Sequence, residues 1–144
     1  MTATEQAVEL ARRAARAASD KLAHDVVIID VSDRLALTDC FVLATADNER
    51  QVHAVVDEVE RRLREEGVKP VRREGESGAR WVLLDFADVV VHVQHAEERV
   101  YYGLERLWKD CPQIAFSDRD DDAGAVGAAS GSASGPGAAT PTRP

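Results

Sequence analysis

The chain has 144 residues, of which 44% are hydrophobic and 31% are charged, a balance typical of one soluble globular domain. Its 18 lysines and arginines against 26 aspartates and glutamates give a net charge of −8, which disfavours binding to nucleic acid through phosphate contacts. The sequence has no recognisable secretory signal, no apolar run of membrane-helix length and no zinc-knuckle spacing of its two cysteines, so we expect a cytoplasmic protein.

The first part of the chain is predicted to form a helix and two strands. Alanines at helical spacing predict a helix over residues 3–22, and Thr2 with Glu5 has the spacing of a capping box. Runs rich in β-branched residues predict strands over residues 25–31 and 40–45. The connection between these strands is too short for a crossover helix, so we expect them to pair antiparallel.

The remainder of the folded region is predicted to hold two helices and three strands. A stripe of valines predicts a helix over residues 49–66, which Asp47 or Asn48 caps and Gly67 ends. Further strands are predicted over residues 68–73, 80–86 and 88–94, and a last helix over residues 96–109. The order α-β-β-α-β-β-β-α predicts an α/β fold, with helices packed against a single mixed sheet of about five strands. The long Val and Ile runs indicate that the first and last strands are buried on both faces.

The composition changes abruptly after Phe116. Residues 117–144 are rich in Gly, Ala, Ser and Pro, and they contain no Leu, Ile or aromatic residue. Such a segment buries too little apolar surface to offset the entropy lost on ordering. We therefore divide the chain into a folded domain, residues 1–116, and a disordered tail, residues 117–144.

Catalytic motifs are not recognisable in the sequence. It lacks the GxSxG pattern of a nucleophile elbow and the glycine-rich loops that bind phosphates. His92 and His95 are three residues apart, but no further ligand signature accompanies them, which favours ordinary strand or surface histidines over a zinc site. Cys40 begins a predicted strand and is interpreted as a small core side chain. We therefore expect no metal and no cofactor.

A cluster of carboxylates follows the first predicted strand, at Asp30, Asp33 and Asp39. Mg²⁺ prefers oxygen ligands together with substrate phosphates, so this cluster is compatible with a Mg²⁺-dependent enzyme. Aspartates at strand ends also form Asx turns, and we favour that structural role because no phosphate-binding loop or convergent lysine accompanies them.

Trp81 begins an apolar strand directly after a polar loop. Strand alternation places Trp81, Leu83 and Asp85 on one face of the sheet. Trp81 is either a core aromatic or an anchor for a partner, and both interpretations stay open at this point. Tyr101 and Tyr102 are adjacent in the last predicted helix and point about 100° apart, so we expect one of them to be partly exposed.

Several segments, taken together, resemble the ribosomal silencing factor family (RsfS, also called Iojap-like). They are TDCFVLAT at residues 38–45, ERQV at 49–52, WVLLD at 81–85, DVVVHV at 88–93, Tyr102, and LERLW at 104–108. The resemblance covers about residues 4–116, and its strength lies in several motifs that keep the same order and spacing.

The resemblance implies a fold like that of nucleotidyltransferases, without their catalytic apparatus. It implies a non-enzymatic factor that binds a basic protein of the large ribosomal subunit, at the face that meets the small subunit. The bound factor would block subunit joining and so repress translation when nutrients are short. The family also implies a homodimer when the protein is free.

Five residues are expected to carry this docking role. Trp81 would be an apolar anchor, and Asp85 and Asp88 would form charge-assisted hydrogen bonds with Arg or Lys of the partner. Glu98 and Tyr101 on the last helix would extend the surface. Two alternative functions remain at this point, a Mg²⁺-dependent enzyme related to nucleotidyltransferases and an adaptor with a partner outside the ribosome.

The sequence departs from the family pattern at three positions and in its tail. Ala46 stands where members usually carry Gly, Ala87 stands before the second Asp of the strand turn where Gly is usual, and Cys40 replaces a frequent aromatic. If the turn requires a positive φ, Ala87 costs roughly 1 kcal/mol there.

Overall fold

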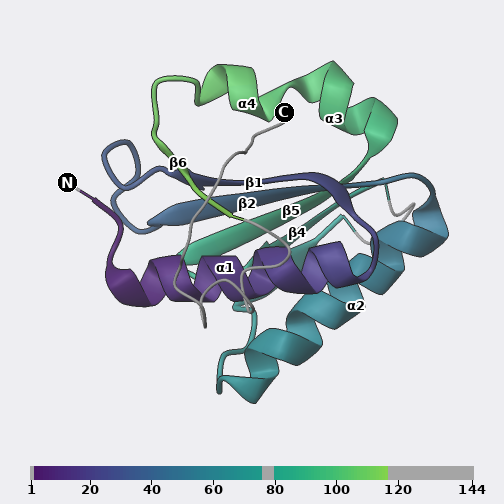
Figure 1. The fold of residues 1–144 in the computed structure, drawn as a ribbon, viewed down its shortest axis with the longest axis horizontal. Coiled ribbons are helices and arrows are strands. Elements are labelled where there is room, and N and C mark those ends of the chain that lie inside the picture. Colours follow the sequence, from purple (N-terminus) through teal and green to yellow (C-terminus); the bar gives the residue numbers. More distant parts are fainter. Residues whose placement is uncertain (1, 76–79, 117–144) are drawn as a thin grey trace, which may run out of the picture.

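The computed structural model describes residues 2–75 and 80–116, which form one sheet between two layers of helices (Figure 1). In chain order the elements are α1 (Glu5–Asp20), β1 (His24–Asp30), β2 (Cys40–Ala46), α2 (Glu49–Glu65), β3 (Arg72–Glu74), β4 (Trp81–Asp85), β5 (Val89–His95), α3 (Ala96–Tyr102), α4 (Leu104–Leu107) and β6 (Gln113–Ile114). The helices α1 and α2 cover one face of the sheet, and α3 and α4 lie over the other. None of these described helices is long and apolar enough to cross a bilayer.

The sheet has six strands in the order β3-β4-β5-β2-β1-β6. The predicted antiparallel pairing of β1 with β2 is confirmed, and β2 pairs parallel with β5, so the sheet is mixed as expected. The prediction of about five strands missed β6, which pairs antiparallel with β1 over only two residues and is too short to leave a periodic pattern. The short third strand also lies later than predicted, at Arg72–Glu74 in place of 68–73.

The ends of α1 differ from the prediction. Thr4, not Thr2, is the N-cap residue, because its hydroxyl accepts the backbone N–H of Ala7 at 3.1 Å. At the other end the helix was predicted to reach Leu22, but it stops at Asp20 and Leu22 is 79% exposed. Leu22 has a φ of +68° because the chain closes with the Ala23 N–H donating to the Ala18 carbonyl, the pattern of a Schellman motif.

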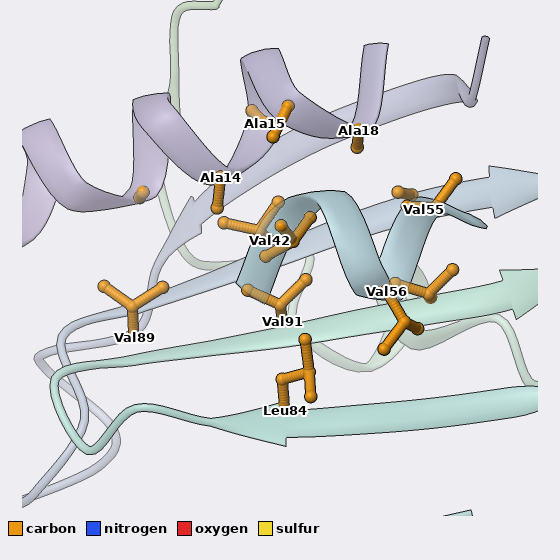
Figure 2. Close-up of a cluster of buried hydrophobic side chains, with 14 of the residues drawn as sticks. Ala14, Ala15, Ala18, Val42, Val55, Val56, Leu84, Val89 and Val91 are labelled. Carbon is orange, nitrogen blue, oxygen red and sulfur yellow. The ribbon is translucent and has the colours of Figure 1, made fainter. Parts of the chain in front are cut away.

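The larger core lies between the sheet and α1 and α2. The alanine face of α1 packs on the sheet, since small side chains let the helix backbone approach the strands closely. The predicted valine stripe of α2 is confirmed, and Asn48 caps this helix by accepting the Gln51 N–H at 2.8 Å. Figure 2 shows the meeting of the two helices and the sheet at Ala14, Ala15, Ala18, Val42, Val55, Val56, Leu84, Val89 and Val91, all of which are fully buried.

A smaller core lies on the opposite face of the sheet. It contains Ile29, Val31, Phe41, Leu43, Val90 and Cys111, with Leu104 and Trp108 packed against it. Burial of β5, the last of the predicted strands, is nearly complete, as predicted. The first strand is buried only in its second half, because its beginning at His24 lies at the exposed rim of the sheet.

The last helix is broken, which the prediction of one helix over 96–109 missed. Gly103 adopts the left-handed conformation with a φ of +52° and separates α3 from α4. The segment predicted as a disordered tail, residues 117–144, lies outside the described residues.

Replacing Leu22 by Gly is expected to raise the free energy of unfolding by about 1 kcal/mol, because Gly adopts a positive φ without strain. Gly67 holds the equivalent position after α2, with a φ of +81°, and provides the matched control. Gly67→Ala should lower the unfolding free energy by a similar amount, as measured by urea denaturation. A Leu22→Gly protein no more stable than the parent would contradict this account.

Candidate docking surface

Trp81 lies where β4 begins, on the face of the sheet that α3 and α4 cover. It is half-buried, and the burial of β4 alternates as predicted, with Trp81, Leu83 and Asp85 on the less buried face. The indole ring contacts the ring of Tyr102 at 4.7 Å between centroids, and its N–H donates to Nδ1 of His92 at 3.2 Å. The Trp81 side chain is therefore partly packed within the chain and partly exposed, and its role as a docking anchor stays a prediction.

Aromatic side chains continue outward from Trp81 along α3. The rings of Tyr101 and Tyr102 meet edge to face at 4.9 Å, and these residues are 81% and 52% exposed. We call Trp81, Tyr101 and Tyr102 the aromatic patch. Val100 of α3 and Leu107 of α4 are also exposed. Exposed apolar surface of this kind is typical of sites that bind another macromolecule.

Tyr102 is a member of the patch that the sequence prediction did not include. Its position depends on the break at Gly103. The chain turns there, and Leu104 of α4 packs against the smaller core. A Gly directly after two tyrosines favours a helix end at that point, and this signal could have indicated Tyr102 but was not used.

The break between α3 and α4 is held by Arg99. This buried side chain donates from Nε and Nη2 to the two oxygens of Glu105, both at 2.9 Å, and from Nη1 to the Thr45 hydroxyl at 2.6 Å. The bidentate pair crosses the left-handed residue Gly103, and Thr45 belongs to β2. Arg99 therefore joins α3, α4 and the sheet.

Glu98 lies near the patch but is engaged within the chain. Arg80 donates to Glu98 at 2.9 Å and to Glu97 at 2.6 Å, and its hydrogen bond lowers the pKa of the Glu98 carboxyl. Potential ligand atoms of His95, Glu97 and Glu98 come within 4.8 Å of one another. His95 Nδ1, however, already accepts the backbone N–H of Glu97 at 3.1 Å, and Arg80 bonds one oxygen of each of the two carboxylates.

Asp85 and Asp88 lie at the other end of β4, in the turn that joins β4 to β5. Asp85 accepts the N–H of Ala87 at 2.8 Å and lies 3.6 Å from the guanidinium of Arg72. Asp88 is exposed, and its backbone carbonyl accepts the N–H groups of Asp39 and Cys40. The five predicted docking residues therefore form two groups, Trp81, Glu98 and Tyr101 at one end of the strand and Asp85 and Asp88 at the other.

Two of the three aspartates proposed as an alternative Mg²⁺ site, Asp30 and Asp39, bond to the beginning of the chain. Asp30 accepts the backbone N–H of Ala3 at 3.0 Å and the hydroxyl of Ser32 at 2.6 Å, and Asp39 accepts the N–H of Thr4 at 3.0 Å. Burial acts to raise the pKa of Asp30, but these hydrogen bonds outweigh it and leave the pKa below its ordinary value. This arrangement agrees with the structural role that the sequence favoured.

Cys40, between β1 and β5, is buried as expected. Burial and the nearby carboxylates of Asp30, Asp39 and Asp88 raise the pKa of the Cys40 thiol to about 12. The thiolate is therefore scarce at neutral pH, and Cys40 is a poor nucleophile.

Comparison with known proteins places this arrangement in a family. The family model described as "Ribosomal silencing factor during starvation" matches residues 4–139. The chain belongs to the ribosomal silencing factor family. The ribosomal silencing factor of Halalkalibacterium halodurans is 42% identical over 106 residues, which are 74% of this chain and 91% of that protein. The chloroplastic Iojap protein of Arabidopsis thaliana is 33% identical over 114 residues, 79% of this chain and 46% of that protein.

Solved structures agree with this membership. A crystal structure of a Chromobacterium violaceum protein is 38% identical, with a TM-score of 0.69 over 71% of this chain and 85% of that one. A Bacillus halodurans protein is also 38% identical, with a TM-score of 0.65 over 78% of this chain and 99% of that one. The resemblance seen in the sequence is thus confirmed at the level of family and fold.

Two departures from the silencing-factor pattern have different structural consequences. Ala87 has a φ of +74°, since the Asp88 N–H donates to the Phe86 carbonyl across it at 3.0 Å and forms a tight γ-turn. This turn therefore does favour glycine. Ala46 is a buried residue of β2, and its φ is outside the left-handed region, so alanine causes no backbone strain there.

Ala87→Gly is expected to raise the unfolding free energy by about 1 kcal/mol, because it removes the left-handed strain of an exposed alanine. Ala46→Gly is the matched control and should lower the unfolding free energy by about 1 kcal/mol or more, because it adds chain entropy and removes a buried methyl group. Urea denaturation of both variants measures the two changes. Equal signs for the two substitutions would refute the assigned strain.

The stability of the protein should fall with acid through His92. Burial lowers the pKa of His92 from its ordinary 6.5 to about 4, so protons bind the unfolded chain more tightly. The stability contributed by neutral His92 is fully present above pH 6.5 and is lost as the pH falls toward 4. The unfolding free energy of the parent, minus that of His92→Phe, should drop by about 2 kcal/mol between about pH 7 and pH 4.5. A difference that does not change with pH would contradict the assigned pKa.

Proposed function

We propose that this protein represses translation by binding a basic protein of the large ribosomal subunit at the inter-subunit face. The bound protein blocks joining of the small subunit when nutrients are limiting. It acts in the cytoplasm, without catalysis, metal or cofactor, and it is a homodimer when free. The observation that carries the proposal is family membership, since relatives at about 40% identity are named ribosomal silencing factors.

The aromatic patch supports a docking role for Trp81. Tryptophan and tyrosine dominate the binding energy of many interfaces because they bury large rings with little loss of side-chain entropy. Trp81 is half-buried and contacts Tyr102, whose ring contacts Tyr101 in turn. A partner that covers these rings would remove apolar surface from water without first rearranging the sheet.

The net charge of the chain favours a basic partner. The chain carries a net charge of −8, and Asp88 is exposed at the turn that ends the same β-hairpin. An acidic field speeds the encounter with a basic protein more than it adds to the final affinity. Asp85, Asp88 and Glu98 would then form charge-assisted hydrogen bonds with lysines or arginines of the partner.

Sedimentation of purified ribosomal subunits tests the proposal. With the protein present, the fraction of subunits joined into whole ribosomes should fall, and the protein should travel with the large subunit. If it stays at the top of the gradient and joining is unaffected, the proposal is wrong for this chain and an adaptor with a non-ribosomal partner becomes the better explanation.

Trp81→Ala should weaken binding to the large subunit by about 2 kcal/mol or more, because it removes a ring expected to be the apolar anchor. Leu22→Ala is the control, since Leu22 is an exposed apolar residue two positions after α1, the helix that covers the opposite face of the sheet. Affinity is measured by co-sedimentation and stability by thermal unfolding. Unchanged affinity in a stable Trp81→Ala protein would remove Trp81 from the docking surface.

A further inference from the structure

Beneath the aromatic patch, one buried imidazole holds the indole of Trp81. We propose that His92 is a positioning residue, which fixes the Trp81 ring through the indole N–H and so prepares it for docking; this inference rests on the proposed function. The donor is Nε1 of Trp81, the acceptor is Nδ1 of His92, and the two nitrogens lie 3.2 Å apart.

The surroundings of His92 leave its ring little freedom. His92 lies in the middle of β5, opposite Leu43 of β2 and Leu83 of β4. The ring of Phe41 meets the imidazole at 5.0 Å between centroids, and the residue is only 6% exposed. A side chain that is packed on every side and fixed on a central strand is a rigid support for a group bonded to it.

Packing alone does not account for an imidazole at this position. Because Nδ1 accepts the indole proton, the proton of neutral His92 is on Nε2, which is buried and has no partner within the described ranges 2–75 and 80–116. A phenyl ring would fill the same space without burying an unpartnered N–H. The bond to Trp81 is what the imidazole supplies and a phenyl ring does not.

Two further contacts show that Trp81 is constrained from several directions. Tyr102 contacts the indole ring from α3 at 4.7 Å between centroids. Gly75 has a φ of +87°, and a Cβ atom built on it would overlap the carbonyl oxygen of Trp81, so the backbone at Gly75 lies very close to that of Trp81. The backbone is thus confined by Gly75 and the ring by His92 and Tyr102. An anchor that is already ordered loses less entropy on binding.

The hydrogen bond itself is measurable in the unsubstituted protein. A through-bond NMR coupling between the indole nitrogen of Trp81 and Nδ1 of His92 is expected, with the His92 proton on Nε2. Trp108→Phe assigns the two indole resonances, because the chain has two tryptophans. A missing coupling, or the proton on Nδ1, would overturn the proposal without any assumption about the ribosome.

Two substitutions of His92 separate positioning from packing. His92→Phe keeps an aromatic ring and removes the acceptor, whereas His92→Asn places an amide oxygen near the position of Nδ1. In His92→Phe we expect faster solvent exchange of the Trp81 indole proton and about fivefold to tenfold weaker binding to large subunits. His92→Asn should restore slow exchange and most of the affinity. Recovery of neither property in a folded His92→Asn protein would contradict the role.

A double-mutant cycle decides whether His92 acts through Trp81. In a Trp81→Phe background, which has no indole N–H at that position, His92→Phe should have no further effect on affinity. An equal loss in both backgrounds would show that His92 affects binding by another route and would overturn the inference. If the parent protein fails to bind large subunits at all, the proposed function fails, while the NMR coupling still decides whether His92 holds the indole.

Discussion

The candidate surface depends on the buried contacts of Arg99. A short helix over a sheet has little stability of its own, and α3 spans only Ala96–Tyr102 before the left-handed residue Gly103 ends it. Arg99 compensates with a bidentate pair to Glu105 beyond the break and a hydrogen bond to Thr45 in the sheet. Because the guanidinium is planar and always charged, these three bonds fix the angle of the break as well as its position. That angle places Tyr102 against Trp81.

The two faces of the sheet differ in how completely they are covered, and we infer that one serves stability and the other serves recognition. The α1 and α2 layer is long and closely packed, and its buried side chains are almost all Ala, Val and Leu. The opposite layer is short and broken, so it leaves aromatic rings exposed while it still covers a small core. Burial between the sheet and α1 and α2 stabilises the fold. That stability offsets the cost of the apolar residues that stay exposed on the other face. It also offsets the strain of Ala87 in the β4–β5 turn. We infer that the stability of the first layer makes the exposed second layer possible.

The sequence predicted periodic elements well and predicted tertiary contacts poorly. The valine stripe of α2 reflects the helical period of 3.6, and β4 alternates with the period of 2 of a strand that is buried on one face. The apolar runs of β2 and β5 are continuous because these central strands are buried on both faces. The candidate site was harder to predict from the sequence. Trp81 and Asp85 were identified from their residue type alone. Tyr102, His92 and Arg99 could not be identified in this way, because their contacts are with residues distant in the chain. Resemblance to a family gave the docking hypothesis, but the pairing of a buried imidazole with an indole required the register of β4 and β5.

The contacts also distinguish the residues that would attract the proposed partner from those that would hold it. Glu98 is bonded to Arg80, and Asp85 lies near Arg72 and accepts a backbone N–H, so each of these charges is partly neutralised within the chain. A basic partner must compete with those bonds, which reduces the net gain from each new ion pair. The rings of the aromatic patch face no such competition, since covering them releases water alone. The acidic field would therefore govern how fast a basic partner arrives, and Trp81, held by His92, how long it stays.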